Sequence, residues 1–412
     1  MSSPSSPDRD RLWGQLMELA EFCERDQPGF TRRVFSEPYR RSREWVRARM
    51  EAAGLAVRVD AVGNLLGELP GTEPGLPPIA LGSHTDTVAG GGRFDGMVGV
   101  LGAIEVARLG EGWRHPILVA DFLGEEPNAF GLSCLGSQAV AGQLTPAHLE
   151  LSDGSGNTLA GALATWGRPP ERLAEALWSN RAPLAYLELH IEQGRRLEHA
   201  GLPLGVVTGI AGIHRAVAKL SGRADHAGTA AMGGRRDALA GAAELVLLVE
   251  RLAQAGGAGV GTVGRLEIDP GATNVVPGAA TAGLEFRSAD AGWLQERHRQ
   301  LEVGLRELSQ RRGLALELEW VSAGAPVLCS EPLRRLIREA LEELGEAPLE
   351  LESGASHDAA HLAAICPVGM IFIPSRDGRS HCPEEWSEPG QVALGVAALL
   401  AAVQRLDRAG LG

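Results

Sequence analysis

The segment that decides the fold is Gly82–Gly99, GSHTDTVAGGGRFDGMVG, which places two acids and a histidine among six glycines. The apolar run PPIALG before His84 predicts a short buried strand, so His84 and Asp86 fall at its carboxyl end. Open α/β sheets present functional groups at that end of their strands. The Gly90–Gly92 run lets the backbone turn tightly and bring Asp95 back towards the strand end. This segment therefore predicts an α/β sheet with a polar site at its strand ends.

The sequence around this segment alternates between apolar strand runs and helical periodicity. This alternation predicts a doubly wound α/β domain with a mixed sheet. Gly54 is a suitable cap for the second helix, and Gly63-Asn64 is the expected turn of a hairpin. Helices are predicted over 11–25, 36–54, 96–109, 331–345 and a last segment ending at 408, strands over 55–60, 64–69, 77–84, 115–123, 184–194 and 368–374, and polar loops over 353–361 and 375–385.

A separate unit is predicted within this domain. Strands over 214–222, 261–268, 281–288 and 314–321 and helices over 235–254 and 293–310 give the order β-α-β-β-α-β. That order is typical of a ferredoxin-like unit. We therefore expect a catalytic domain made of residues 1–207 and 325–412, with residues 208–324 inserted as a second domain.

Size and charge exclude several classes of protein. A chain of 412 residues exceeds the usual size of one core, which favours two domains. The net charge of −13, without a dense basic run, argues against nucleic acid or anionic membrane as a partner. No uninterrupted apolar span reaches the roughly 18 residues of a membrane helix. The start, MSSPSSPDRD, is expected to be a loose tail through residue 7 without a signal pattern, so we expect a cytoplasmic protein with reduced cysteines.

Five residues at predicted strand ends or in loops of the larger domain are candidate ligands of two divalent metals: His84, Asp95, Glu126, His190 and His381. Carboxylates and imidazoles together suit Zn²⁺, Mn²⁺, Co²⁺ or Ni²⁺. A metal pair about 3.5–4 Å apart needs a bridging carboxylate, and Asp95 is the best candidate for it. His84 and His190 would complete one metal, and Glu126 and His381 the other.

Two further acids, Glu125 and Asp86, are not among the candidate metal ligands. Glu125 is the candidate general base, because a free carboxylate beside an activated water can take its proton and return it to a leaving nitrogen. Asp86 is expected to orient an imidazole or to hold a nearby base. Taken singly, each histidine is more often a surface or hydrogen-bonded residue than a ligand. The metal hypothesis depends on the convergence of five separate segments on one place.

The inserted unit contains a second set of polar residues. Arg287 lies at a predicted strand end, where its guanidinium could bind a substrate carboxylate with two hydrogen bonds. His226 could stabilise an oxyanion, and Asn274 lies in the loop GATNVVPG. A surface arginine and a loop asparagine are also common without a function.

Several stretches together resemble the metal-dependent amidohydrolases of the M20 peptidase group, and most closely the branch of N-carbamoyl-L-amino-acid hydrolases, β-ureidopropionases and allantoate amidohydrolases. The stretches that carry this resemblance are GSHTDTV, GGRFDGMVGVLGAIE, the Glu125-Glu126 pair, LHIEQGRRLE, DHAGTAAMGGRRDAL, TNVVPG, SGASHDA and SHCPEE. The resemblance runs from about residue 35 to the C-terminus.

The resemblance implies the five-ligand set, with Glu125 as the general base and Asp86 as its partner. It also implies that the inserted unit is a lid through which the enzyme forms a homodimer. Substrate would be held by Gln193 and His357 from the catalytic domain and by His226, Asn274 and Arg287 from the lid, with His226 serving the neighbouring subunit.

Three departures from the family pattern bear on the substrate. Pro127-Asn128-Ala129 stands where many relatives have a segment with an arginine. Ser356 replaces a usual glycine, and Ile213-His214 replaces a segment that contains glutamine. None of these positions is a proposed metal ligand.

The sequence therefore predicts a cytoplasmic di-metal hydrolase that cleaves a linear C–N bond of a small, carboxylate-bearing N-carbamoyl or ureido acid. An allantoate amidohydrolase, a dipeptidase or an aminoacylase of the same group would share the metal chemistry. A metal-free binding protein would lack ligands that this chain retains. A cyclic amidase would be expected to have a barrel with a modified lysine, which the β-α-β-β-α-β insertion disfavours.

Overall fold

A computed structural model describes residues 6–411, so most of the predicted N-terminal tail lies outside the described residues. The chain forms two compact units. The first unit comprises Met1–Thr208, Cys329–Leu351 and His357–Gly412, and the second comprises Gly209–Leu328 and Glu352–Ser356.

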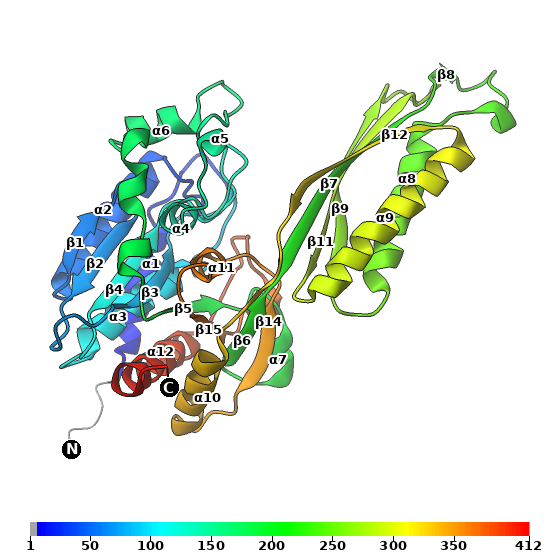
Figure 1. Ribbon diagram of the computed structural model, residues 1–412. Coiled ribbons are helices and arrows are strands. Elements are labelled where there is room, and N and C mark those ends of the chain that lie inside the picture. Colours follow the sequence, from blue (N-terminus) through cyan, green and yellow to red (C-terminus); the bar gives the residue numbers. More distant parts are fainter. Residues whose placement is uncertain (1–5, 412) are drawn as a thin grey trace. The chain divides into compact units, whose positions relative to one another are not determined.

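The first unit is built on a nine-stranded mixed sheet, which confirms the predicted mixed α/β class (Figure 1). Its order is β1-β2-β4-β3-β5-β15-β6-β13, and β14 also pairs with β6. The four central strands β4, β3, β5 and β15 run parallel, and the outer pairs are antiparallel. The strands are β1 (Ala56–Val59), β2 (Leu65–Leu69), β3 (Ile79–His84), β4 (Ile117–Phe122), β5 (Ala185–Ile191), β6 (Gly205–Ile210), β13 (Val327–Leu328), β14 (Leu349–Ser353) and β15 (Val368–Ile373).

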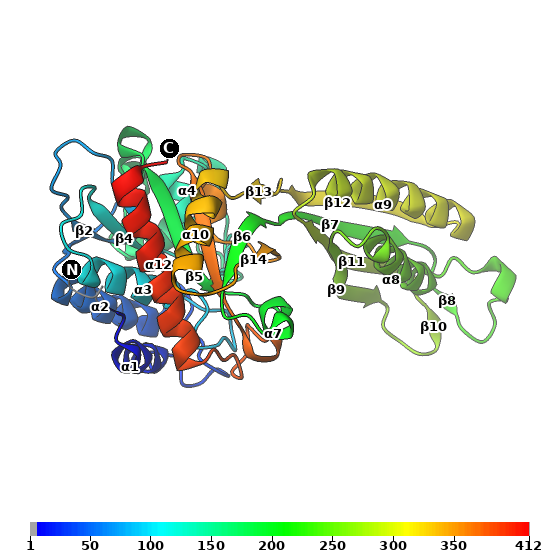
Figure 2. The same ribbon diagram turned by 90° about the horizontal axis from the view of Figure 1, so that it is seen from below.

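Helices cover both faces of this sheet, which is why its central strands are buried along their whole length. One face packs against α3 (Met97–Leu109), α10 (Glu331–Glu343) and α12 (Pro389–Ala409), as Figure 2 shows. The other face is covered by α4 (Leu135–Val140) and α11 (Asp358–Leu362). The remaining helices of this unit are α1 (Arg9–Ala20), α2 (Glu37–Ala52), α5 (Pro146–Leu149), α6 (Leu159–Thr165) and α7 (Arg196–Ala200), with short 3₁₀ turns at 170–176, 179–181 and 376–378.

Helix α3 lies unusually close to the sheet, and glycine makes this possible. A Cβ atom on Gly99 would lie 2.5 Å from the carbonyl oxygen of Leu189 in β5. Gly96, with φ of 70°, precedes the first helical residue, in a conformation that residues with a side chain rarely adopt. The start of α3, and with it Asp95, is therefore held against the ends of β3 and β5.

Helix α12 is long and apolar enough to cross a membrane by length and composition alone. Half of its most apolar window is buried within the protein, and its residues Val396, Leu399 and Val403 belong to the main core. A core helix of this kind accounts for its apolar character.

The second unit has a four-stranded antiparallel sheet in the order β12-β7-β11-β9. Along the chain its main elements follow the order β-α-β-β-α-β: β7 (Gly212–Ser221), α8 (Ala238–Gln254), β9 (Val260–Asp269), β11 (Ala279–Ser288), α9 (Ala291–Arg312) and β12 (Ala315–Ala323). The short strands β8 (Asp225–His226) and β10 (Val275–Val276) form a separate pair. The helices pack on one face of the sheet around Phe286, Leu301 and Leu305.

Three local predictions were wrong in their limits. Helix α1 ends at Ala20 instead of residue 25, because the guanidinium of Arg32 donates to the carbonyls of Leu19 and Phe22, each at 2.9 Å, and so caps the end. The hairpin turn is wider than Gly63-Asn64, since Asp60 accepts the amides of residues 62, 63 and 64. The loop predicted over 353–361 contains the start of α11, and Ser137 donates to its first residue, Asp358.

Candidate metal centre

Parallel strands bring the candidate ligands of the first unit together. His84 is the last residue of β3, and His190 lies at the end of the neighbouring strand β5. Glu126 follows the end of β4, which pairs with β3 on its other side. His381 comes from the loop between β15 and α12, where its positive φ of 56° turns the backbone. All four segments reach the same end of the sheet.

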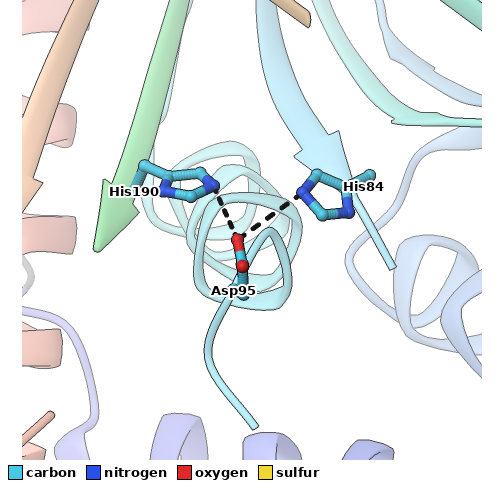
Figure 3. Close-up of side chains that lie close together, drawn as sticks. All are labelled: His84, Asp95 and His190. Carbon is cyan, nitrogen blue, oxygen red and sulfur yellow. Dashed lines mark ion pairs between the residues drawn. The ribbon is translucent and has the colours of Figure 1, made fainter. Parts of the chain in front are cut away.

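Asp95 lies at the centre of this group. Its Oδ1 atom is 3.2 Å from Nε2 of His190 and 3.8 Å from Nε2 of His84 (Figure 3). Its Oδ2 atom is 3.1 Å from Nε2 of His381, which in turn is 3.4 Å from Oε1 of Glu126. Two groups of three ligand atoms, each within 4.8 Å of one another, therefore share Asp95. The structure brings all five candidate ligands together.

The hydrogen bonds of the two buried histidines fit a cation between them and Asp95. Nδ1 of His190 lies 2.9 Å from the carbonyl oxygen of Ile191, and Nδ1 of His84 lies 3.1 Å from that of Asp86. A carbonyl oxygen can only accept, so Nδ1 donates in both rings, and in the neutral form of each ring Nε2 presents a lone pair to a carboxylate oxygen. Nε2 of His190 is buried without a hydrogen-bond partner among residues 6–411. Lone pairs that face each other in a buried site suit a metal ion.

The electrostatics of the cluster indicate an excess of buried negative charge. Burial disfavours the charged form of His84, but Glu125, Asp86 and Asp95 outweigh this effect and raise its pKa well above the usual value. Burial, together with Asp95, raises the pKa of Glu126 to about 8. The hydrogen bond to Asp95 raises the pKa of His381 to about 9. In each case the negative charge of neighbouring carboxylates favours the form of the group that carries the extra proton.

Asp86 is placed to hold its neighbours. Its two carboxylate oxygens accept the backbone amides of Glu125 and Glu126, each at 3.1 Å, and Oδ1 is also 3.5 Å from Nδ1 of His84. Asp86 thus fixes the segment that carries Glu125 and Glu126 against the end of β3. Its role as an orienting residue remains a prediction.

Glu125 lies beside the ligands without belonging to either group of three. Its Oε2 atom is 3.7 Å from Nε2 of His84, and the thiol of Cys134 donates to its other oxygen at 3.4 Å. Burial and the nearby Glu126 raise its pKa well above the usual value, although His84 opposes the shift. A carboxylate in this position can accept a proton from a water molecule held by the cluster.

Glu385 supports the site and was not singled out from the sequence. Its Oε1 atom accepts the amides of Phe94 and Asp95 at 2.7 and 3.1 Å, and its other oxygen accepts the hydroxyl of Ser380 at 2.8 Å. It is fully buried, and Gly92 leaves room for it, because a Cβ there would overlap the carboxyl group. The adjacent Trp386, which packs on Phe94, was the one signal of burial in an otherwise polar loop.

Gln193 and His357, the predicted substrate residues of the first unit, also lie at the cluster. Nε2 of Gln193 donates to Oδ2 of Asp95 at 2.9 Å, from a backbone with φ of 56°. The ring of His357 is buried and meets the ring of His190 edge-on, with centroids 4.5 Å apart. Both side chains adjoin candidate ligands, and their roles in substrate binding remain predictions.

The predicted substrate residues of the second unit do not gather in one place within the chain. His226 is exposed on β8, where it pairs with Val275 of β10. Asn274 immediately precedes Val275 in the sequence. His226 and Asn274 both lie near the start of β11, because the amide of Gly222, shortly before β8, donates to the carbonyl of Gly278, just before β11. Arg287 is eight residues from Ala279 along β11, which separates them by roughly 26 Å. It donates to Glu285 at 2.7 Å and to the carbonyl of Gly354 at 3.2 Å.

The segment Pro127-Asn128-Ala129, which departs from the family pattern, lines a cavity of about 290 Å³ beside Asp86 and Glu126. Arg33 lines the same cavity and forms an ion pair with Glu24. A cation is therefore present on this side of the cluster, although it comes from a different part of the sequence.

The candidate catalytic groups gather at the carboxyl ends of parallel strands in a mixed sheet. The model of peptidase family M20/M25/M40 matches residues 72–405. The chain belongs to this family, and within it to the amidohydrolases, which hydrolyse C–N bonds.

Relatives match along almost the whole chain. An N-carbamoyl-L-amino acid amidohydrolase from Geobacillus stearothermophilus is 42% identical over 401 residues, covering 96% of this chain and 98% of the relative. A ureidoglycolate hydrolase from Oryza sativa subsp. japonica is 36% identical, covering 98% of this chain and 86% of the relative. A solved amidase of the hydantoinase/carbamoylase family from Burkholderia multivorans superposes with a TM-score of 0.87 at 33% identity, covering 97% of this chain and 98% of the other.

Proposed function

We propose that this protein hydrolyses the linear C–N bond of a small N-carbamoyl amino acid or related ureido acid. The observation that carries the proposal is the position of Asp95, whose two oxygens face His84 and His190 on one side and His381 on the other. The names of relatives that align over nearly the full length support this class of substrate.

The proposed cofactor is a pair of divalent metal ions. His84 and His190 would hold one ion, Glu126 and His381 the other, and Asp95 would contact both. When bound, such a pair makes water a stronger acid and polarises a carbonyl oxygen. The donor set of imidazoles and carboxylates accepts Zn²⁺, Mn²⁺, Co²⁺ or Ni²⁺.

Glu125 is the proposed general base. It would accept a proton from the attacking water and return it to the leaving nitrogen when the C–N bond breaks. Asp86 keeps Glu125 in place through its backbone amide. A carbamoyl substrate and one water would yield the free amine and carbamate, which then decomposes into carbon dioxide and ammonia.

The second unit is the proposed lid and dimerisation domain. Arg287 would bind the substrate carboxylate, while His226 would stabilise negative charge on the carbonyl oxygen and Asn274 would contact the substrate. The separation of His226 and Asn274 from Arg287 along β11 supports a homodimer in which a site draws on both copies. Gln193 and His357 would contact the substrate from the first unit, and the proposed location remains the cytoplasm.

The substrate class is tested by ammonia release from the metal-free protein refilled with each of the four metals in turn. The panel comprises N-carbamoyl-L-amino acids, 3-ureidopropionate, allantoate and ureidoglycolate, the last because of the relatives that bear its name. N-acyl amino acids and dipeptides serve as controls for an aminoacylase or dipeptidase. Cleavage of these controls alone would refute the proposed substrate class, and full activity without metal would refute the proposed cofactor.

A further inference from the structure

A second cavity of the first unit lies outside the metal centre and is lined by arginines. It has a volume of about 450 Å³ and is lined by residues of α2, of the hairpin β1–β2, and of the end of α6 and the segment that follows it. We call it the arginine pocket. Its lining residues are Arg40, Arg43, Glu44, Arg47, Val59, Gly63, Leu65, Thr165, Trp166 and Arg168.

The arginine pocket is positively charged in a chain whose net charge is −13. Four arginines face one glutamate in its lining. Two of the four already have strong partners. Arg40 bonds to Glu37 and Glu44, and Arg43 is buried against the carbonyl of Gly63 and the hydroxyl of Tyr39.

The other two arginines retain most of their hydrogen-bonding capacity. The side chain of Arg168 makes one hydrogen bond among residues 6–411, from NH1 to the carbonyl of Asp60 at 3.2 Å. Arg47 approaches one acid, Glu51, at 3.9 Å, which is too long for a hydrogen bond. Each guanidinium has five N–H donors in a planar fork that matches carboxylate or phosphate oxygens.

We propose that the arginine pocket binds a small dianion through a phosphate or carboxylate group. Arg47 and Arg168 would form hydrogen bonds to this group, and the positive charge of Arg43 would attract it. Trp166 lines the same cavity and is fixed by stacking on Tyr39 at 5.8 Å between ring centroids. The indole offers a flat apolar surface beside the charged groups, so an aromatic group attached to the anion would add to its affinity.

Contacts connect the arginine pocket to the candidate metal centre, and through them the proposed ligand would act as an effector. NH1 of Arg43 lies 3.7 Å from Oδ2 of Asp121, and this pair is buried. Thr85, between His84 and Asp86, donates to the same carboxylate at 3.0 and 3.2 Å. An anion that draws Arg43 away from Asp121 would therefore change the support of the strand end that carries His84.

The binding test uses the metal-loaded protein and inorganic phosphate in isothermal titration calorimetry at constant ionic strength. We expect saturable binding to the wild type and affinity at least about tenfold weaker in the double variant Arg47→Gln/Arg168→Gln, since two charge-assisted contacts are lost. Arg40→Gln is the matched control, because Arg40 lines the same pocket but is committed to acids. Absence of saturable binding, or equal binding in the wild type and the double variant, would overturn the site.

A nucleoside monophosphate and citrate, titrated in the same way, identify the type of ligand. Tighter binding of the nucleoside monophosphate than of phosphate assigns a role to Trp166, and preference for citrate assigns a carboxylate ligand. The effector role rests on the proposed function and is tested separately by ammonia release. A phosphate-dependent change of KM in the wild type and Arg40→Gln, absent in the double variant, supports it. Binding without any kinetic change overturns the effector role and leaves the site itself intact.

Discussion

The two sets of candidate functional residues differ in how the chain positions them. In the first unit, side chains from four segments reach one aspartate and are mostly buried. In the second unit, His226 is exposed near one end of β11, and Arg287 is held by Glu285 near the other. The first set lies together within one copy of the chain, whereas the members of the second set lie apart within one copy. The comparison separates residues that one copy brings together from residues that it holds apart.

The substitution Asp95→Ala should disturb the first set of residues most severely. Because Asp95 contacts both groups of candidate ligands, we expect the loss of both metals and a fall in turnover on the order of 10³-fold or more. Metal content by mass spectrometry and ammonia release provide the measurements. Asp377→Ala is the control, since Asp377 is an exposed acid. Retention of two metals per chain would contradict the shared-ligand geometry.

Substitutions of the adjacent residues Glu125 and Glu126 distinguish a general base from a metal ligand. We expect Glu125→Gln to keep its metals and to lose about 10²–10⁴-fold in kcat, the usual contribution of a general base. Glu126→Gln should instead lose metal from the His381 side. The two variants are compared for metal content and kcat under identical conditions. Near-normal kcat in Glu125→Gln would disprove the assignment of the base.

Complementation tests the second half of the comparison. We expect His226→Ala and Arg287→Ala to be nearly inactive when each is alone. If a site takes these residues from different copies, subunit exchange between the two variants leaves about a quarter of the sites intact. Recovery of activity after mixing is the measurement, and each variant mixed with itself is the control. No recovery despite proven exchange would show that one copy supplies both residues.

The smallest expected effect is a loss of stability on removal of Glu385, which supports the first set of residues. Glu385→Ala leaves the buried amides of Phe94 and Asp95 without acceptors, which should cost roughly 2–4 kcal/mol of stability. Thermal and denaturant unfolding measure this cost. Glu384→Ala, at the exposed neighbouring position, should change stability by less than about 0.5 kcal/mol. Equal stability of the two variants would remove Glu385 from the supporting role.

The proximity of the candidate ligands could be expected from the sequence because strand order constrains it. His84, Glu126 and His190 follow runs that are recognisable as buried strands, and the carboxyl ends of parallel strands share one side of a sheet. His381 lacks this constraint, since it lies in a loop, and its inclusion depended on donor chemistry and on the resemblance to a known family.

Other features could not be read from the sequence, because they depend on distant contacts. The end of α1 is set by Arg32, whose guanidinium reaches back to helix carbonyls. Glu385 resembles any solvated acid of a polar loop until its bonds to Phe94 and Asp95 are visible. The early start of α11 within a polar segment has the same origin, because Asp358 is bonded to Ser137 of another helix.

The chain leaves the nine-stranded sheet through β6 and returns to it through β13, and these two strands pair with each other, Ile210 opposite Val327 and Gly209 opposite Leu328. The points of departure and return are therefore about 5 Å apart, a gap that an ordinary two-residue hairpin turn spans. Residues 211–326 could therefore be excised, or exchanged for the corresponding segment of a relative, without stretching β6 or β13.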